Sequence, residues 1–251
     1  MNTMQGSQQQ QAYDRGITIF SPDGRLYQVE YAREAVKRGT AAVGVRTSDG
    51  VVLVADRRTR SPLVEASSVE KLHEVDDHLG IASAGHVADA RQLVDLARRR
   101  AQMEWLRYDQ PLGVEALTKE ITDHIQQYTQ TGGARPFGVA LLVAGIEDGE
   151  PRLFETDPSG TPYEWSAVAV GGGRDTIQEY LEDHYGESLT LDDGIGLALE
   201  ALASASDGDL DPHGVEIATV DVESERFDAL DPDTVAAIVT EHGLAEEGGD
   251  E

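Results

Sequence analysis

The chain has 251 residues and no cysteine, and its 47 Asp and Glu residues against 20 Lys and Arg give it a formal net charge of −27. The lack of cysteine excludes disulfides and thiolate metal sites, and so acidic a chain is an unlikely partner for nucleic acid, whose phosphates carry the same sign of charge. No apolar run approaches the length needed to cross a bilayer and no secretory leader is visible, so we expect a soluble, cytoplasmic protein that makes no membrane contact.

The acidity also predicts the environment of the protein. Repulsion among carboxylates destabilises a compact chain unless salt screens it, and only three basic residues are lysine: Lys37, Lys71 and Lys119. We therefore predict a halophilic, archaeal source. Disorder is the alternative for so charged a chain, but 39% apolar residues with clear periodicity argue against it. The arginine clusters at 57–60 and 98–100 are expected to pair with neighbouring carboxylates.

The first predicted helix follows a tail and a turn. Residues 1–12 are polar and without periodicity, which indicates a mobile tail, and Ser21-Pro22-Asp23-Gly24 has the composition of a tight turn. Gly39 stands where a C-cap glycine would end the helix. The helix itself is predicted from apolar residues at helical spacing, namely Leu26, Val29, Ala32 and Val36.

The rest of the chain alternates groups of strands with pairs of helices. Strands are predicted at 41–46, 51–55, 71–75, 79–84, 139–144, 152–156, 163–170, 215–222 and 226–229. Amphipathic helices are predicted at 87–106, 113–128, 174–185, 191–205 and 232–242. This order is typical of an α+β fold in which helices cover both faces of two stacked antiparallel sheets. We expect one domain over residues 13–242, between the tail 1–12 and an acidic tail at 243–251.

The stretch from residue 13 to residue 32 carries the most specific pattern, and it resembles the N-terminal signature of α-type proteasome subunits. Further agreement lies at 68–71, 85–93, 127–138 and 157–158. The matching segments of the signature are Tyr13-Asp14-Arg15, Phe20-Ser21-Pro22-Asp23-Gly24-Arg25-Leu26 and Gln28-Val29-Glu30-Tyr31-Ala32.

The resemblance implies both a fold and a function. The fold would be a four-layer αββα sandwich like that of N-terminal nucleophile hydrolases, with an extra N-terminal helix. The function would be that of a non-catalytic subunit in the outer heptameric ring of an archaeal 20S core particle. Such rings stack on catalytic β subunits, gate the passage of unfolded protein substrates and dock a regulatory ATPase.

Thr40 is the strongest candidate for a catalytic residue. In the catalytic β-type relatives a Gly-Thr bond is cut, and the exposed threonine attacks peptides with its own amine as base. Asp56 and Lys71 stand about where an acid and a lysine accompany that nucleophile. The alternative function is therefore a self-processing β-type threonine protease. Because cleavage before Thr40 would discard the α-type pattern, we interpret Thr40 and Asp56 as structural residues.

The resemblance assigns Lys71 another role, in a pocket between neighbouring subunits that grips the C-terminal carboxylate of an activating ATPase. An ammonium on a flexible stem is a good point charge for a carboxylate. The simpler alternative is a strand-edge lysine paired with Glu70 or Glu74. Other positions that match this pocket are Gly85, Leu26 and Val29.

Two further groups match functional positions of the family. The gate cluster corresponds to Tyr13, Asp14, Arg15, Pro22 and Tyr31, with residues 1–12 as the plug over the pore. The loop that lines the pore constriction corresponds to Thr131, Gly132 and Gly133, where glycines let backbones crowd around an axis. A plain helix-to-strand connection is compatible with the same residues.

No cofactor and no metal site is predicted. The loop 171–176 has Thr176 where the third glycine of a dinucleotide loop belongs, so we expect a tight turn. The spacing of His73, Glu74 and His78 does not fit a zinc-protease helix. A run that begins like a calcium loop at Asp207, Asp209 and Asp211 has Pro212 in place of the required glycine.

Overall fold

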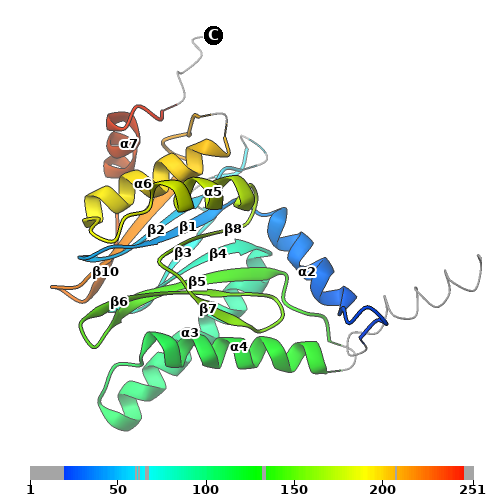
Figure 1. The fold of residues 1–251 in the computed structure, drawn as a ribbon. Helices are drawn as coiled ribbons and strands as arrows, with labels where there is room; N and C mark the ends of the chain where they lie inside the picture. Colours follow the sequence, from blue (N-terminus) through cyan, green and yellow to red (C-terminus); the bar gives the residue numbers. More distant parts are fainter. Residues whose placement is uncertain are drawn as a thin grey trace, which may run out of the picture.

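The computed structural model describes residues 20–59, 61, 63–65, 68–131, 134–206 and 208–245. Two five-stranded antiparallel sheets are stacked face to face, and helices cover both outer faces (Figure 1). One outer face carries α5 (Arg174–His184), α6 (Leu191–Ser204) and α7 (Pro232–Glu241), and the other carries α3 (Val87–Tyr108) and α4 (Val114–Gln130). This arrangement confirms the predicted αββα sandwich.

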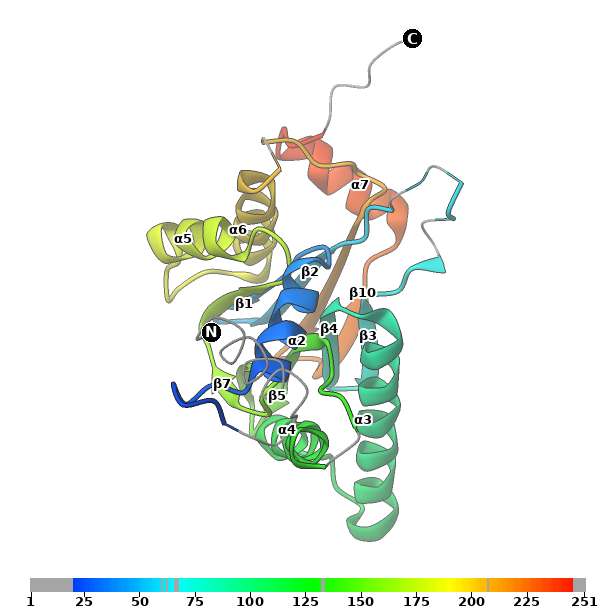
Figure 2. The same ribbon diagram turned by 90° about the vertical axis from the view of Figure 1, so that its right-hand side faces the viewer.

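The extra N-terminal helix, α2 (Tyr27–Lys37), runs across one end of the sandwich (Figure 2). No helix within the described ranges is long and apolar enough to span a membrane. The predicted tail 1–12 lies outside the described residues, as do residues 246–251 of the acidic tail.

Each sheet has its longest buried strand at its centre. The first sheet has the order β10 (Arg226–Ala229), β9 (Val215–Asp221), β2 (Gly50–Asp56), β1 (Ala42–Arg46) and β8 (Ala167–Val170). The second has the order β3 (Leu72–Asp76), β4 (Leu79–Gly85), β5 (Val139–Glu147), β6 (Glu150–Thr156) and β7 (Pro162–Glu164). Every residue of β2 is buried, as expected for a strand that is covered on both faces.

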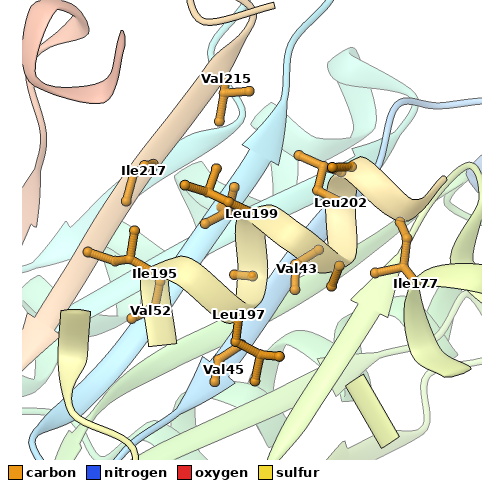
Figure 3. Packing of buried hydrophobic residues seen from close by; sticks show 14 of the residues in the cluster. Val43, Val45, Val52, Ile177, Ile195, Leu197, Leu199, Leu202, Val215 and Ile217 are labelled. Atoms are coloured by element: carbon orange, nitrogen blue, oxygen red, sulfur yellow. The ribbon is translucent and has the colours of Figure 1, made fainter. Parts of the chain in front are cut away.

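Alternation of side chains along the strands builds three apolar layers. Val43 and Val45 of β1 face α5 and α6, where they pack with Leu197 and Leu202 (Figure 3). Leu141 and Val143 of β5 face α3 and α4. The residues that alternate with these along each strand point into the layer between the two sheets. This layer is rich in alanine, whose small side chain allows the sheets to pack closely.

The predicted turn and helix before the first strand are confirmed. The Gly24 N–H donates to the Ser21 carbonyl at 2.8 Å, and Gly24 has a φ of +74°. The apolar stripe of α2 is buried, and the helix ends at Lys37. Gly39 does not have the positive φ of a left-handed C-cap glycine. It is required for another reason, because a Cβ on Gly39 would lie 2.5 Å from the backbone nitrogen of Gly85.

The single strand predicted at 163–170 is wrong. Residues Pro162–Glu164 pair with β6 in the second sheet, and Ala167–Val170 pair with β1 in the first. The change of sheet occurs between two adjacent residues: the Trp165 N–H donates to Leu153 in β6, while the Ser166 carbonyl accepts from Arg46 in β1. Strand propensity continues through this segment, so only the long-range partners reveal the break.

Candidate functional site

The structure brings Thr40, Asp56 and Lys71 together at the end of the sandwich where α2 lies. Thr40 immediately precedes Ala41, whose carbonyl accepts from the N–H of Asp56, the last residue of β2. Lys71 precedes β3 in the other sheet and is only 6% exposed. Its Nζ atom donates to the Thr40 hydroxyl at 2.8 Å and to the carbonyl oxygens of Thr40 at 2.7 Å, Ala41 at 2.8 Å and Asp56 at 2.8 Å.

These contacts do not equip Thr40 as a nucleophile. The Thr40 hydroxyl donates to the Asp56 carbonyl, and the nitrogen of Thr40 would become an amine able to act as a base only in a chain cut before this residue. The Asp56 carboxylate is turned toward Arg58, whose Nη2 lies 2.7 Å from Oδ2. Burial lowers the pKa of the Lys71 ammonium to about 8. The negative charges of Asp56 and Glu216 favour the charged form and limit the decrease. The cluster therefore ties the two sheets together.

The segment before Thr40 is held tightly by its neighbours. The Gly172 N–H donates to the Gly39 carbonyl at 2.8 Å. A Cβ on Gly171, whose φ is +96°, would lie 2.7 Å from the Thr40 carbonyl oxygen. The loop 171–173 is thus a tight turn, as predicted, and it packs closely against the segment before Thr40. Next to this loop lies a hollow of about 240 Å³, lined in part by Thr40, Arg38 and Arg58.

The residues predicted for ATPase docking lie at the same end of the molecule, but most of them already make close contacts within the subunit. The pairing of Lys71 with Glu70 or Glu74 is wrong, because its ammonium contacts the four oxygens named above. Gly85 ends β4 with a φ of +121°, and a Cβ there would lie 2.4 Å from the Gly138 carbonyl oxygen. Val29 lies on the buried face of α2, and Leu26 is half-buried at the N-cap of this helix.

The predicted gate residues are only partly described. Tyr13, Asp14 and Arg15 lie outside the described residues. Pro22 is exposed in the turn before α2, and Tyr31 is 51% exposed on the helix.

Of the predicted pore residues, Thr131 caps the end of α4, and its hydroxyl donates to the Gln127 carbonyl at 2.7 Å. Gly132 and Gly133 lie outside the described residues, as does Asp207 of the calcium-like run. Within the described ranges, no group of acidic or histidine residues could hold a metal ion.

Sequence reasoning missed two ion pairs near α2. The Arg135 guanidinium contacts both carboxylate oxygens of Asp89, at 2.6 and 2.7 Å, and the Gly138 N–H donates to the same carboxylate at 2.9 Å. Burial opposes ionisation of Asp89, but these donors outweigh it and lower the pKa of the carboxyl. Arg33 of α2 contacts Asp157 in the same two-pronged way, at 2.9 and 3.0 Å. The sequence signal is faint, because 46 and 124 residues separate the partners.

Comparison with known proteins covers nearly the whole chain. The family model described as "Proteasome subunit" matches residues 36–220, and a model of the N-terminal signature of A-type proteasome subunits matches residues 13–35. The alpha 2 proteasome subunit of Haloarcula marismortui is 71% identical over 248 residues, which is 99% of this chain and 100% of that protein.

Two further relatives also come from haloarchaea, in agreement with the predicted source. The alpha proteasome subunit of Natronomonas pharaonis is 69% identical, with 99% of this chain and 98% of that protein covered. The alpha 1 proteasome subunit of Haloferax volcanii is 66% identical, again over 99% of this chain and 98% of that protein. With its N-terminal signature and its domain both matched, the chain belongs to the proteasome subunit family, in the α-type group.

Proposed function

We propose that this chain is a non-catalytic α subunit of a 20S proteasome core particle. It assembles with six further α subunits into an outer ring, stacks on β subunits, controls the passage of unfolded proteins and docks a regulatory ATPase. The observation that carries this proposal is the packing of α2 and of Gly39 against the body of the protein. Residues 27–39, which a self-processing protease would remove, form a helix with a buried apolar stripe and a close glycine contact, and both belong to the fold.

The packing of α2 supports this assignment on energetic grounds. Val29 is 3% exposed, Ala32 7% and Val36 8%. Cleavage before Thr40 would free the helix and remove its apolar stripe from the end of the sheets, at a cost of about 1.5–3 kcal/mol for each large side chain exposed. It would also break the hydrogen bond between Gly172 and the Gly39 carbonyl. A segment with these contacts is suited to stay in the mature chain.

The second candidate function is the β-type threonine protease, and one observation favours it. Thr40, Asp56 and Lys71 do converge, with Nζ of Lys71 2.8 Å from the Thr40 hydroxyl. The same residues also serve the first proposal, because Lys71 joins backbone carbonyls from two segments of the first sheet. The orientation of the Asp56 carboxylate toward Arg58 favours the structural role.

The exchange Thr40→Ala separates the two candidates. In particles assembled from this chain and its β partner, we expect hydrolysis of short peptides to be unchanged, since the activity belongs to the β subunits. Assembly is checked by size-exclusion chromatography in molar salt. Loss of hydrolysis in assembled Thr40→Ala particles would establish the protease instead.

The gating and docking roles need their own test. Removal of residues 1–12 is expected to raise the hydrolysis of short peptides by the assembled particle, because the tail would no longer cover the pore. For docking, Lys71 must exchange at least one of its internal oxygen partners for the carboxylate of the ATPase. Lys71→Ala is therefore expected to abolish ATPase stimulation. Undiminished stimulation in assembled particles would refute a role for Lys71 in docking.

A further inference from the structure

The backbone of Lys71 is held by a carboxylate from the other sheet. Glu216 lies in β9 of the first sheet, and its Oε2 atom accepts the N–H groups of Lys71 at 3.1 Å and of Leu72 at 3.3 Å. Because β3 is an edge strand of the second sheet, this carboxylate gives the N–H groups at the start of the strand an acceptor. Glu216 therefore fixes the point from which the Lys71 side chain extends.

Arg57 in turn holds the Glu216 carboxylate. Its Nη1 atom lies 3.3 Å from Oε1 of Glu216, while Nε and Nη2 donate to the His213 carbonyl at 3.2 and 3.1 Å. The Arg57 side chain is 12% exposed and that of Glu216 18%. Salt screens such partly buried charges much less than exposed ones. The charges of this pair therefore act on their neighbours even in molar salt.

Two carboxylates act on the Lys71 ammonium in the part of the chain that the structure describes. They belong to Asp56, which also contacts Arg58, and to Glu216. The Thr40 hydroxyl and the backbone carbonyls around the ammonium carry no charge. Burial lowers the pKa of Lys71 to about 8, and both carboxylates limit the decrease. Near pH 8, a change in either neighbouring charge therefore changes the fraction of Lys71 that is protonated.

We propose that Glu216, held by Arg57, is a positioning residue that fixes Lys71 at the start of β3 and keeps its ammonium charged for binding a carboxylate. The inference rests on the proposed docking role of Lys71 and deepens it. A lysine attracts a carboxylate by the charge of its ammonium, so the neighbours that govern this charge also govern docking. Glu216 acts through Lys71 and not by contact with the partner.

The exchange of each partner for glutamine predicts pH shifts of opposite sign. Glu216→Gln keeps an oxygen that can accept the two N–H groups but removes a negative charge, which disfavours the ammonium. Arg57→Gln leaves the charge of Glu216 uncompensated, which favours the ammonium. The measurement is the ratio of stimulated to unstimulated tetrapeptide hydrolysis by assembled particles as a function of pH. The stimulant is a synthetic peptide with the last residues of the organism's own regulatory ATPase.

The pH at which half of the stimulation is lost should move down by about half a unit in Glu216→Gln and up by about as much in Arg57→Gln. The double variant should return close to the wild type, because the pair and its replacement are both neutral overall. General loosening of the structure cannot account for shifts of opposite sign. Shifts in the same direction, or no shift, would overturn the proposal.

A matched control is the ion pair between Glu155 of β6 and Arg174 of α5, with contacts at 2.8 and 3.1 Å. Neither residue is among the charges that act on Lys71. Glu155→Gln and Arg174→Gln should therefore leave the pH dependence of stimulation unchanged, even where they lower Tm. A shift in these controls like that in the Glu216 or Arg57 variants would assign the effect to altered stability and contradict the inference.

NMR of the full chain with ¹³C-labelled lysine distinguishes failure of the inference from failure of docking. The chain has only three lysines, so the signal of Lys71 is identified by its loss in Lys71→Met. The pH at which Lys71 titrates should fall in Glu216→Gln and rise in Arg57→Gln. If it does not move, the inference is wrong, whatever Lys71→Ala does to stimulation. If it moves but stimulation does not follow, the docking role of Lys71 is refuted and the effect of Glu216 on its charge stands.

Discussion

The buried ammonium of Lys71 gives a prediction whose size follows from the contacts. In Lys71→Met the stem of the side chain is retained, but the ammonium is lost, whose three N–H groups are shared among four oxygens: the Thr40 hydroxyl and the carbonyls of Thr40, Ala41 and Asp56. Hydrogen bonds to a charged group contribute about 1.5 kcal/mol each at the low end, or about 4.5 kcal/mol for the three that an ammonium can donate. The exchange therefore removes a large favourable contribution.

Part of that loss is offset, because methionine carries no charge to be buried. The pKa of Lys71 falls from 10.5 to about 8 because burial outweighs the charges of Asp56 and Glu216, and this net shift corresponds to about 3 kcal/mol against the charged form. The net cost of Lys71→Met is then about 1.5 kcal/mol. For a domain of this size, that corresponds to a decrease in Tm of about 3–6 °C.

The assay is thermal unfolding in molar salt, followed by circular dichroism. Lys37→Met is the matched control, because the Lys37 side chain is 65% exposed and forms a surface ion pair with Glu34 on the same helix. Since such exposed pairs contribute little, that control should change Tm by less than a degree or two. A Lys71→Met variant as stable as the wild type would show that the four oxygens do not depend on Lys71, and would refute the reasoning.

Further predictions concern other charges and the close contacts of α2. The folded pKa of Lys71, about 8, lies below its unfolded value, so between these two values the unfolded chain binds more protons and the stability of the wild type rises with pH. The Tm difference between wild type and Lys71→Met should therefore widen from pH 8 to pH 10. A constant difference would contradict the lowered pKa. Gly39→Ala should cost about 1–3 kcal/mol in denaturant unfolding, because its Cβ would lie 2.5 Å from the Gly85 nitrogen, whereas Gly186→Ala, with nothing within 4 Å, should be neutral. The lowered pKa of Asp89 contributes stability above the unfolded pKa that is lost as pH falls through the folded pKa. Asp89→Asn should therefore be more destabilising at pH 7 than at pH 2, and equal destabilisation at both would contradict this. With a net charge of −27, the protein should lose Tm when molar salt is replaced by about 0.1 M salt, and an unchanged Tm would refute the role of screening.

Much of the fold can be predicted because the local pattern and the long-range structure agree. The stripe of α2 repeats at helical spacing and is buried where expected, at Val29, Ala32 and Val36. The fully apolar run of β5 indicates a strand covered on both faces, and eight of its nine residues are buried. The packing partner of α2 lies on the side that its periodicity indicates, and β5 has partners on both faces, as its unbroken apolar run indicates.

The predictions from sequence are wrong where the contacts of a residue are made with partners far away in the sequence. Lys71 has Glu70 beside it in sequence, which favours a surface ion pair, but the oxygens that bind its ammonium lie 15 to 31 residues away. The break between Trp165 and Ser166 has no local signal, since each residue pairs with a different sheet. The sequence marks Gly39 as the end of a helix, but the need for glycine there comes from the approach of another backbone, which no local pattern contains.

The central claim is that the residues before Thr40 remain part of the working protein. Intact mass spectrometry of this chain, purified within its assembled particle, tests it most directly. We predict a mass that includes α2 and the Gly39–Thr40 bond, with peptide hydrolysis found only when the β subunits are present. A chain that begins at Thr40 and hydrolyses peptides without β subunits would contradict the account.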